Sequence, residues 1–372
     1  MTIAIKTCGV TGQKVQKLLQ ENREGKEFIF VDSKASKWGT KVNNIPVVSI
    51  YKLAELYRKE EIEEIIIPDK FFDEAFVKEL ISIGIEEDII RVFSIEKFDT
   101  NQAYLLKPNS YTYLRYLEFH VCDHCNLNCR GCGHFSPLVN GEEFTDLEQF
   151  SKDINRLKEL ILHIKVIRIM GGEPLLNSNL DKFIIETRKA YPYSDIYLLT
   201  NGLLLHTISE DLWACLRENN VTIEISVYPV AYEKADSYMA LIQKHGVKLS
   251  NMFLVDEFFA MLHSKQEYPY DNVVECSCRN LKDGKIAACP LPLYGKYYNE
   301  YFGENLPFET GQIDIYNNDL TGPELMKKLN EPFEMCSYCH SWLSHKNRKK
   351  STNGDWAYRK KGEAQKEDWY AQ

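Results

Sequence analysis

The sequence CNLNCRGC at residues 125–132 places Cys125, Cys129 and Cys132 in a C-x3-C-x2-C spacing. Cysteine thiolates are the usual protein ligands of iron–sulfur clusters. These three can bind three irons of a cubane [4Fe–4S] cluster and leave the fourth iron without a protein ligand. An open coordination position is what distinguishes a catalytic metal site from a structural one. The spacing therefore predicts a catalytic iron–sulfur cluster.

Zinc and disulfide bonds are the two alternatives for these thiols. Cys122 lies just before the triplet, so the run can be divided into the pairs Cys122/Cys125 and Cys129/Cys132. The two halves of a zinc ribbon are separated by roughly 15–20 residues so that they can converge, and the three residues between these pairs are too few for that. A disulfide framework is typical of secreted proteins, and nothing in the sequence marks this protein as secreted. The spacing therefore favours the iron–sulfur cluster.

The residues around the triplet alternate between strand and helix patterns. Residues 116–121 read as a strand that ends at the cysteine loop, and the sequence TDLE at 145–148 reads as a capping box that opens a helix through about residue 160. Strands alternating with helices of this length predict βαβ units and a parallel sheet. The same alternation continues with strands expected at 164–170, 195–199 and 221–226 and helices at 180–191 and 210–219.

Polar motifs follow the predicted strands. In α/β barrels the chemistry lies at the carboxyl ends of the strands, so we expect these motifs to lie near the cysteine loop. Ordinary turn chemistry is the alternative for the glycines and for the polar side chains. The motifs are Gly171, Gly172, Glu173 and Pro174 after 164–170, Asn201 after 195–199, and Ser226 at the end of 221–226.

Together, the cysteine spacing and the strand-end motifs resemble the radical S-adenosylmethionine (SAM) superfamily. The resemblance implies a partial (β/α)6 barrel in which Cys125, Cys129 and Cys132 hold a [4Fe–4S] cluster. It also implies that the open iron chelates the amino and carboxylate groups of SAM. In that family an electron from the cluster cleaves SAM to methionine and a 5'-deoxyadenosyl radical.

The resemblance also assigns residues to SAM. The glycines of the strand-end motif allow close backbone approach. In one departure, the residue before the third cysteine is usually aromatic in the family but is Gly131 here, and Phe135 is our candidate for the aromatic contact. The implied SAM ligands are Gly171, Gly172, Glu173 and Pro174 at the amino group, Ser226 at the ribose, and Asn201 facing the same ligand.

A second set of cysteines lies towards the C-terminus. It consists of Cys276, Cys278, Cys289, Cys336 and Cys339, with a hairpin turn signal at Asp283 and Gly284. The set is similar to the "twitch" domain, a shortened SPASM domain, which implies one auxiliary [4Fe–4S] cluster. Five cysteines compete for four positions, so we expect one of Cys276 and Cys278 to be spare. A four-cysteine zinc site uses the same ligands and stays open as the alternative.

Residues 1–95 read as a separate Rossmann-like α/β domain. Strands are expected at 2–7, 27–31 and 61–68, and helices at 13–21 and 74–83. The turn CGVTG at 8–12 is not GxGxxG, but Asp32 lies about 20 residues beyond it, where a ribose-binding acid would stand. The stretch from Asp32 through NIPV at 44–47 resembles the N-terminal nucleotide-binding-like domains of enzymes in bacterial surface-glycan synthesis. A nucleotide site and a docking domain without a ligand both stay open.

Composition limits the possible partners and cellular location of the protein. The 372 residues have a formal net charge of −9, which argues against nucleic acid as a main partner. We expect no membrane span, no signal peptide, and a reducing cytoplasm, because the eleven cysteines mostly cluster as ligand sets. Cys8 and Cys215 read as core residues. The expected domains are 1–95 Rossmann-like, 96–113 linker, 114–265 radical SAM barrel, 266–345 twitch-like cysteine-rich domain and 346–372 polar, solvated tail.

The sequence indicates the substrate only by class. We expect an oxidoreductase-type or epimerase-type enzyme that oxidises or tailors a sugar, a nucleotide sugar or a glycan precursor, with flavodoxin or ferredoxin as electron donor. Modification of a ribosomally made peptide is the alternative. A non-enzymatic iron–sulfur redox protein is the second alternative, although the motif at 171–174 and Ser226 would then be needless. Cys122 and His124 lie near enough to the triplet to tune a cluster through contacts with its ligands, and an ordinary loop or packing role is the alternative. For His134, the SAM pocket and solvent both stay open, and no substrate-contacting catalytic residue is identified.

Overall fold

The computed structural model describes residues 2–68, 71–72, 74–93, 105–106, 113–161, 163–192, 194–256, 258–269, 273, 276, 278–340 and 360–371. The chain divides into two compact units, Met1–Tyr113 and Leu114–Gln372. The linker predicted at 96–113 lies outside the described residues except at 105–106 and 113. The barrel and the cysteine-rich domain predicted at 114–265 and 266–345 both fall in the second unit.

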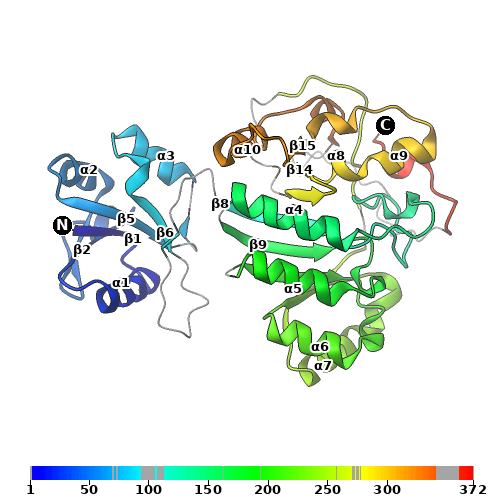
Figure 1. Ribbon diagram of the computed structural model, residues 1–372, viewed down its shortest axis with the longest axis horizontal. Coiled ribbons are helices and arrows are strands. Elements are labelled where there is room, and N and C mark those ends of the chain that lie inside the picture. Colours follow the sequence, from blue (N-terminus) through cyan, green and yellow to red (C-terminus); the bar gives the residue numbers. More distant parts are fainter. Residues whose placement is uncertain are drawn as a thin grey trace. The chain divides into compact units, whose positions relative to one another are not determined.

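The first unit is a sheet with helices on both faces (Figure 1). The strand order is β3-β4-β2-β1-β5-β6-β7, and the neighbours from β4 to β6 are parallel. One core contains residues of α1, and a separate core on the other face contains residues of α2 and α3. The strands are β1 Thr2–Lys6, β2 Glu27–Val31, β3 Lys41–Val42, β4 Ile45–Val48, β5 Ile62–Pro68, β6 Ile90–Phe93 and β7 Leu105–Leu106, and the helices are α1 Val10–Asn22, α2 Ile50–Arg58 and α3 Glu74–Ser82.

The second unit begins with four consecutive βα units. Strands β9 to β12 are parallel, and β8 lies beside β9. A further strand, β13 (Asn280–Lys282), pairs parallel with β8 on its other side. Figure 1 shows α4 and α5 side by side along these strands. The predicted α/β class with parallel sheets is confirmed. The elements are β8 Tyr113–His120, α4 Leu147–Leu160, β9 His163–Met170, α5 Leu180–Ala190, β10 Asp195–Thr200, α6 Glu210–Glu218, β11 Thr222–Val227, α7 Ala235–Lys244 and β12 Lys248–Leu254.

Alternation along the strands separates an apolar face from a polar one. On β8, Leu117 and Phe119 are buried in the core that also contains helix residues such as Leu157. Successive side chains of a strand point to opposite faces, so Glu118 and His120 face the other way, and both are nevertheless buried. The inner face of this sheet therefore carries buried polar groups near the strand ends.

The helix after the cysteine loop is capped differently from the prediction. Asp146, not Thr145, is the N-cap, and its side chain accepts a hydrogen bond from the Gln149 amide. The Thr145 hydroxyl instead donates to the His120 carbonyl at 2.7 Å. The predicted capping box was therefore wrong by one residue. The Thr145 hydroxyl does not cap the helix because it donates a hydrogen bond to His120 at the end of β8, 25 positions earlier.

The C-terminal part of the second unit is built around a hairpin. Strands β13 Asn280–Lys282 and β14 Lys285–Ala287 pair antiparallel about the predicted turn, and β15 Ile313–Asp314 pairs with β14. Helices α8 Leu291–Tyr294, α9 Lys296–Phe302 and α10 Gly322–Lys328 follow or flank these strands. The end of the chain differs from the predicted solvated tail, because Trp369 and Asp368 are fully buried. Among the described residues, no helix combines the length and apolar character needed to cross a membrane.

Candidate functional site

The first three cysteines and the strand-end motifs meet in one pocket. Cys125, Cys129 and Cys132 line it, together with residues at the carboxyl ends of β9, β10 and β11. The loop and the strand ends converge because parallel strands present the same ends to one edge of a sheet. The lining from the strand ends includes Met170, Gly171, Gly172, Thr200, Asn201 and Ser226.

Two glycines allow the cysteine loop to lie directly against the turn after β9. A Cβ atom on Gly171 would lie 2.2 Å from the Cys122 carbonyl oxygen, and one on Gly172 would lie 2.1 Å from the His124 carbonyl oxygen. Because glycine has no Cβ atom, the two segments can form backbone hydrogen bonds. The Gly172 amide donates to the Cys122 carbonyl at 2.9 Å, and the Glu173 amide donates to the His124 carbonyl at 3.2 Å. The close approach predicted for these glycines is therefore an approach to the cysteine loop.

Glu173 is a buried residue that holds the backbone next to the pocket through hydrogen bonds. Its carboxylate is fully buried and accepts hydrogen bonds from the Thr200 hydroxyl at 2.7 Å, the Asn201 amide at 2.8 Å and the Leu175 amide at 3.1 Å. Burial raises the pKa of Glu173 to about 7, and these donors oppose that rise. The carboxylate thus fixes the end of β10, while Pro174 is buried at the start of a short 3-10 helix, Pro174–Leu176.

Asn201 and Ser226 stand beside the thiols. The Asn201 side-chain amide donates to Asn126 Oδ1 at 2.7 Å and approaches Cys125 Sγ at 3.8 Å. Ser226 lines the same pocket from the end of β11. The aromatic residues in the lining are Tyr228 and Phe258, whose rings stack with centroids 6.1 Å apart.

Phe135, our candidate for an aromatic contact, lies elsewhere. It is fully buried and packs against Tyr298, Phe308 and Trp369. Its backbone is left-handed, with φ of 57°, and its side chain lies outside the pocket although His134 and Ser136 on either side of it line the pocket. The prediction was wrong because a local turn, which residue spacing does not reveal, determines where this side chain points.

The thiols present match the needs of a cluster with one open iron. Three thiols line the pocket, and burial raises the pKa of both Cys125 and Cys132. A bound metal offsets this effect, because ligation deprotonates a thiol. Cys122 is turned away: its thiol donates to the Glu173 carbonyl at 3.0 Å, and burial raises its pKa to about 12. In the described part of the chain, no three His, Cys, Asp or Glu side chains converge on a single metal ion. A cubane cluster does not require such convergence, because each cysteine binds a different iron.

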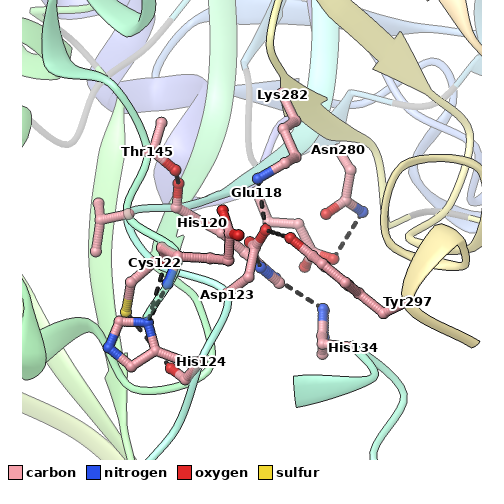
Figure 2. A network of polar contacts seen from close by, with 12 residues as sticks. Glu118, His120, Cys122, Asp123, His124, His134, Thr145, Asn280, Lys282 and Tyr297 are labelled. Carbon is pink, nitrogen blue, oxygen red and sulfur yellow. Dashed lines mark hydrogen bonds and ion pairs between the residues drawn. The ribbon is translucent and has the colours of Figure 1, made fainter. Parts of the chain in front are cut away.

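A buried polar chain leads from this pocket into the C-terminal part of the unit (Figure 2). His134 lines the pocket, and its Nδ1 lies 2.9 Å from His120 Nε2. His120 Nδ1 lies 2.9 Å from Asp123 Oδ1. The other Asp123 oxygen accepts from Lys282 Nζ at 2.6 Å and from the Tyr297 hydroxyl.

The hydrogen-bond chain fixes its own donors and acceptors. A carboxylate only accepts, so His120 donates through Nδ1, and a neutral His120 then accepts at Nε2 from His134. Burial lowers the pKa of His120 to about 4, which keeps the ring neutral. Sequence reasoning did not find this chain, because its partners come from β8, the cysteine loop, β13 and α9.

The second cysteine set also converges, with one exception. Cys276, Cys289, Cys336 and Cys339 line a single, largely apolar pocket. Cys278 does not line it and is exposed. Burial raises the pKa of Cys289 well above its usual value and that of Cys336 to about 11. The structure therefore identifies four candidate ligands among five cysteines.

The Asp32 carboxylate in the first unit already accepts hydrogen bonds from neighbouring residues of the same unit. Its carboxylate accepts from the Cys8 amide at 3.2 Å, the Lys34 amide at 3.0 Å and Lys37 Nζ at 2.9 Å. The thiol of Cys8 also donates a hydrogen bond to the Asp32 carboxylate. Cys8 and Cys215 are both buried, as predicted.

Comparison with known proteins bears on the second unit. Residues 120–247 match the model of the Radical SAM superfamily. The GTP 3',8-cyclase of Clostridium acetobutylicum is 35% identical over 112 residues, which are 29% of this chain and 34% of that protein. The GTP 3',8-cyclase of Staphylococcus saprophyticus is 36% identical over 118 residues, which are 30% of this chain and 34% of that protein. The matched part of the chain thus spans about a third of the length of these relatives.

Among solved structures, similarity is weaker. The structure of BtrN in complex with AdoMet and 2-DOIA is 17% identical, with a TM-score of 0.38, and the match covers 61% of this chain and 92% of that one.

Proposed function

Residues 120–247 form a radical SAM domain, and we propose from this premise that the protein cleaves SAM reductively and removes a hydrogen atom from a substrate. The observation that carries the proposal is the convergence of three thiols with two glycines, Asn201 and Ser226 in one pocket. An iron–sulfur redox protein would need the thiols alone. The added strand-end groups favour a ligand that binds beside the cluster.

In this proposal each group has a distinct role. Cys125, Cys129 and Cys132 hold three irons of a [4Fe–4S] cluster, which supplies the electron that cleaves SAM. Gly171 and Gly172 keep side chains out of the space between the cysteine loop and β9.

The strand-end side chains would bind and orient SAM. Asn201 and Ser226 offer hydrogen bonds from the ends of β10 and β11. Glu173 and Pro174 act mainly by fixing the turn and the Thr200–Asn201 backbone, although a carboxylate has capacity for a further donor such as an ammonium. Tyr228 and Phe258 provide the apolar contact that Phe135 does not.

We assign the second cysteine pocket to one auxiliary [4Fe–4S] cluster. Cys276, Cys289, Cys336 and Cys339 supply four thiols, the number that such a cluster takes when fully ligated. A cluster without an open iron would accept an electron from the substrate and would not bind it. Zinc remains the alternative metal because it takes the same four ligands.

The substrate proposed first is a sugar, a nucleotide sugar or a glycan precursor. The support is the Rossmann-like first unit, whose parallel strands and flanking helices are typical of nucleotide-binding folds. A guanine nucleotide is a second candidate, because the curated relatives named above are GTP 3',8-cyclases. A ribosomal peptide is the third. Flavodoxin or ferredoxin would supply the electron in a reducing cytoplasm.

The first experiment measures 5'-deoxyadenosine formation from SAM by anaerobically reconstituted, dithionite-reduced protein. Wild-type protein should form it, Cys129→Ala should not, and Cys215→Ala should match wild type because that thiol is a buried residue of α6 that does not line the pocket. Formation by Cys129→Ala at the wild-type rate would refute the cluster assignment. SAM binding that is absent in a fully loaded wild-type protein would refute the pocket assignment.

The second experiment identifies the substrate class. Nucleotide sugars, GTP and candidate peptides are added separately, and the increase in 5'-deoxyadenosine formation is measured for each. Stimulation by a nucleotide sugar alone supports the first proposal. Stimulation by GTP or by a peptide alone would replace it.

A further inference from the structure

The last described residues of the chain reach the first cysteine set. The indole Nε1 of Trp369 donates to the Cys132 carbonyl at 2.8 Å. Asp368 Oδ1 accepts from Arg130 Nε at 2.7 Å. Trp369 and Asp368 are both fully buried, whereas the Arg130 side chain is 24% exposed. Residues 366–371, which we call the C-terminal segment, contribute none of the predicted metal ligands.

The same segment is anchored on its other side by backbone pairing. The Trp369 carbonyl accepts from the amides of Met261 and Leu262, each at 2.9 Å, and the Ala371 amide donates to Leu262 at 2.7 Å. Leu262 in turn forms a bridge with Cys339 of the second cysteine set. The C-terminal segment is therefore held at a fixed position between the two cysteine sets.

The turn that carries Cys129 and Cys132 is held both by local contacts and by the C-terminal segment. Gly131 adopts a left-handed backbone, with φ of 67°, and the Cys132 amide bonds to the Cys129 carbonyl at 3.3 Å. The Cys132 carbonyl accepts both the Phe135 amide at 3.0 Å and the Trp369 indole. The contacts from Trp369 and Asp368 thus add side-chain restraints from a distant part of the sequence to this turn.

Aromatic packing reinforces the hydrogen bond to Cys132. The rings of Trp369 and Phe135 stack with centroids 6.2 Å apart and planes inclined by 23°. The ring of Phe302 in α9 also packs against Trp369, with the two centroids 6.1 Å apart. Substitution of Trp369 by phenylalanine would keep most of this packing and remove the N–H donor, so the two contributions can be separated.

We propose that Trp369 and Asp368 are positioning residues for the first cysteine set, and that the C-terminal segment holds the Cys129–Cys132 turn in the geometry that binds metal. A ligand site binds best when its support is rigid before the ligand arrives. The link to a cluster rests on the proposed function, whereas the effect on the turn does not.

Hydrogen exchange measured by mass spectrometry on the full-length, cluster-free chain tests the effect on the turn. A single hydrogen bond contributes about 0.5–1.5 kcal/mol, and a bond to a charged group somewhat more. Exchange in peptides covering 129–135 should therefore become about 2- to 10-fold faster in Trp369→Phe and in Asp368→Asn. The matched control is Trp213→Phe, a buried tryptophan of α6 in the other core of the same unit.

Two outcomes decide the proposal. Faster exchange at 129–135 in both variants, without the same change in the Trp213→Phe control, supports it. Exchange at 129–135 that matches wild type in both variants overturns it, and equal acceleration in the control shows a general loss of stability and also overturns it. If one variant fails to fold, the other decides.

Iron release from the reconstituted protein gives a second readout. A ferrous chelator should remove iron about 2- to 10-fold faster from Trp369→Phe than from wild type. Cys129→Ala gives the rate for the second cysteine set alone, which is subtracted. If wild type takes up no iron at the first set, the proposed function fails, and the hydrogen-exchange comparison still decides the role of the C-terminal segment.

Discussion

A methyl group on the Cα of Gly172 would lie 2.1 Å from the backbone carbonyl oxygen of His124. The two residues are 48 positions apart in the sequence, yet the structure leaves no room for a side chain between them. Because Gly171 stands in the same relation to Cys122, the turn after β9 and the cysteine loop are in direct backbone contact.

Gly172→Ala should destabilise the second unit by about 1–3 kcal/mol, because overpacking a tight contact costs about that much. Urea unfolding of the cluster-free chain measures it. Gly133→Ala is the matched control for stability, because its Cβ would make only ordinary contacts with Met261 at 3.7 Å and beyond. Equal stability of the two variants would contradict the close contact.

Asp123→Asn should cost about 3–5 kcal/mol of unfolding free energy. Asp123 is 1% exposed and pairs with Lys282, whose side chain is 10% exposed, and removing one partner leaves a buried charge uncompensated. Asp146→Asn is the control, because asparagine caps a helix as well as aspartate does. A loss below about 1 kcal/mol would show that Lys282 finds water or another partner.

Cys276→Ala should lower the metal bound by the second cysteine set, whereas Cys278→Ala should leave it at the wild-type level. The reason is that Cys276 lines the pocket with three other thiols and Cys278 does not. Iron and zinc are measured per chain after anaerobic reconstitution, in a Cys129→Ala background that removes the first site. An equal loss of bound metal in the two variants would contradict the assignment of Cys276 as a ligand and Cys278 as a spare cysteine.

Asp32 should make the first unit acid-sensitive. Burial alone would raise the pKa of Asp32, but hydrogen bonds from the Lys34 amide, Lys37 and Cys8 outweigh it and lower the pKa from 3.8 to about 2. A lowered carboxyl pKa gives stability that is present above the unfolded value and lost as pH falls through the folded one. The shift corresponds to roughly 2 kcal/mol.

The acid sensitivity is measured by urea unfolding at about pH 5 and about pH 2.5, followed by the fluorescence of Trp38, whose indole bonds to the Asp32 carbonyl. Wild type should lose more stability than Asp32→Asn between the two pH values. An equal loss in both chains would show that the carboxylate gains nothing from these donors in the folded state.

The sequence by itself determined the parts of the structure that depend on local patterns. The alternation of apolar runs and helix-period segments predicted the strands and helices from residue 116 to residue 227, mostly to within one to three residues. Cysteine spacing and strand-end motifs identified Cys125, Gly172 and Ser226 as members of one site. These features are local because backbone periodicity and turn chemistry are set by neighbours along the chain.

The tertiary structure decided everything that depends on which surfaces meet. It separated Cys276 from Cys278, replaced Phe135 by Tyr228 and Phe258 in the pocket, and brought His120 to His134. It also buried Trp369 against a cysteine 237 residues away. No periodicity or spacing encodes such contacts, because they arise only when packed elements bring distant residues together, and the hydrogen bonds available to a buried group depend on which partners arrive.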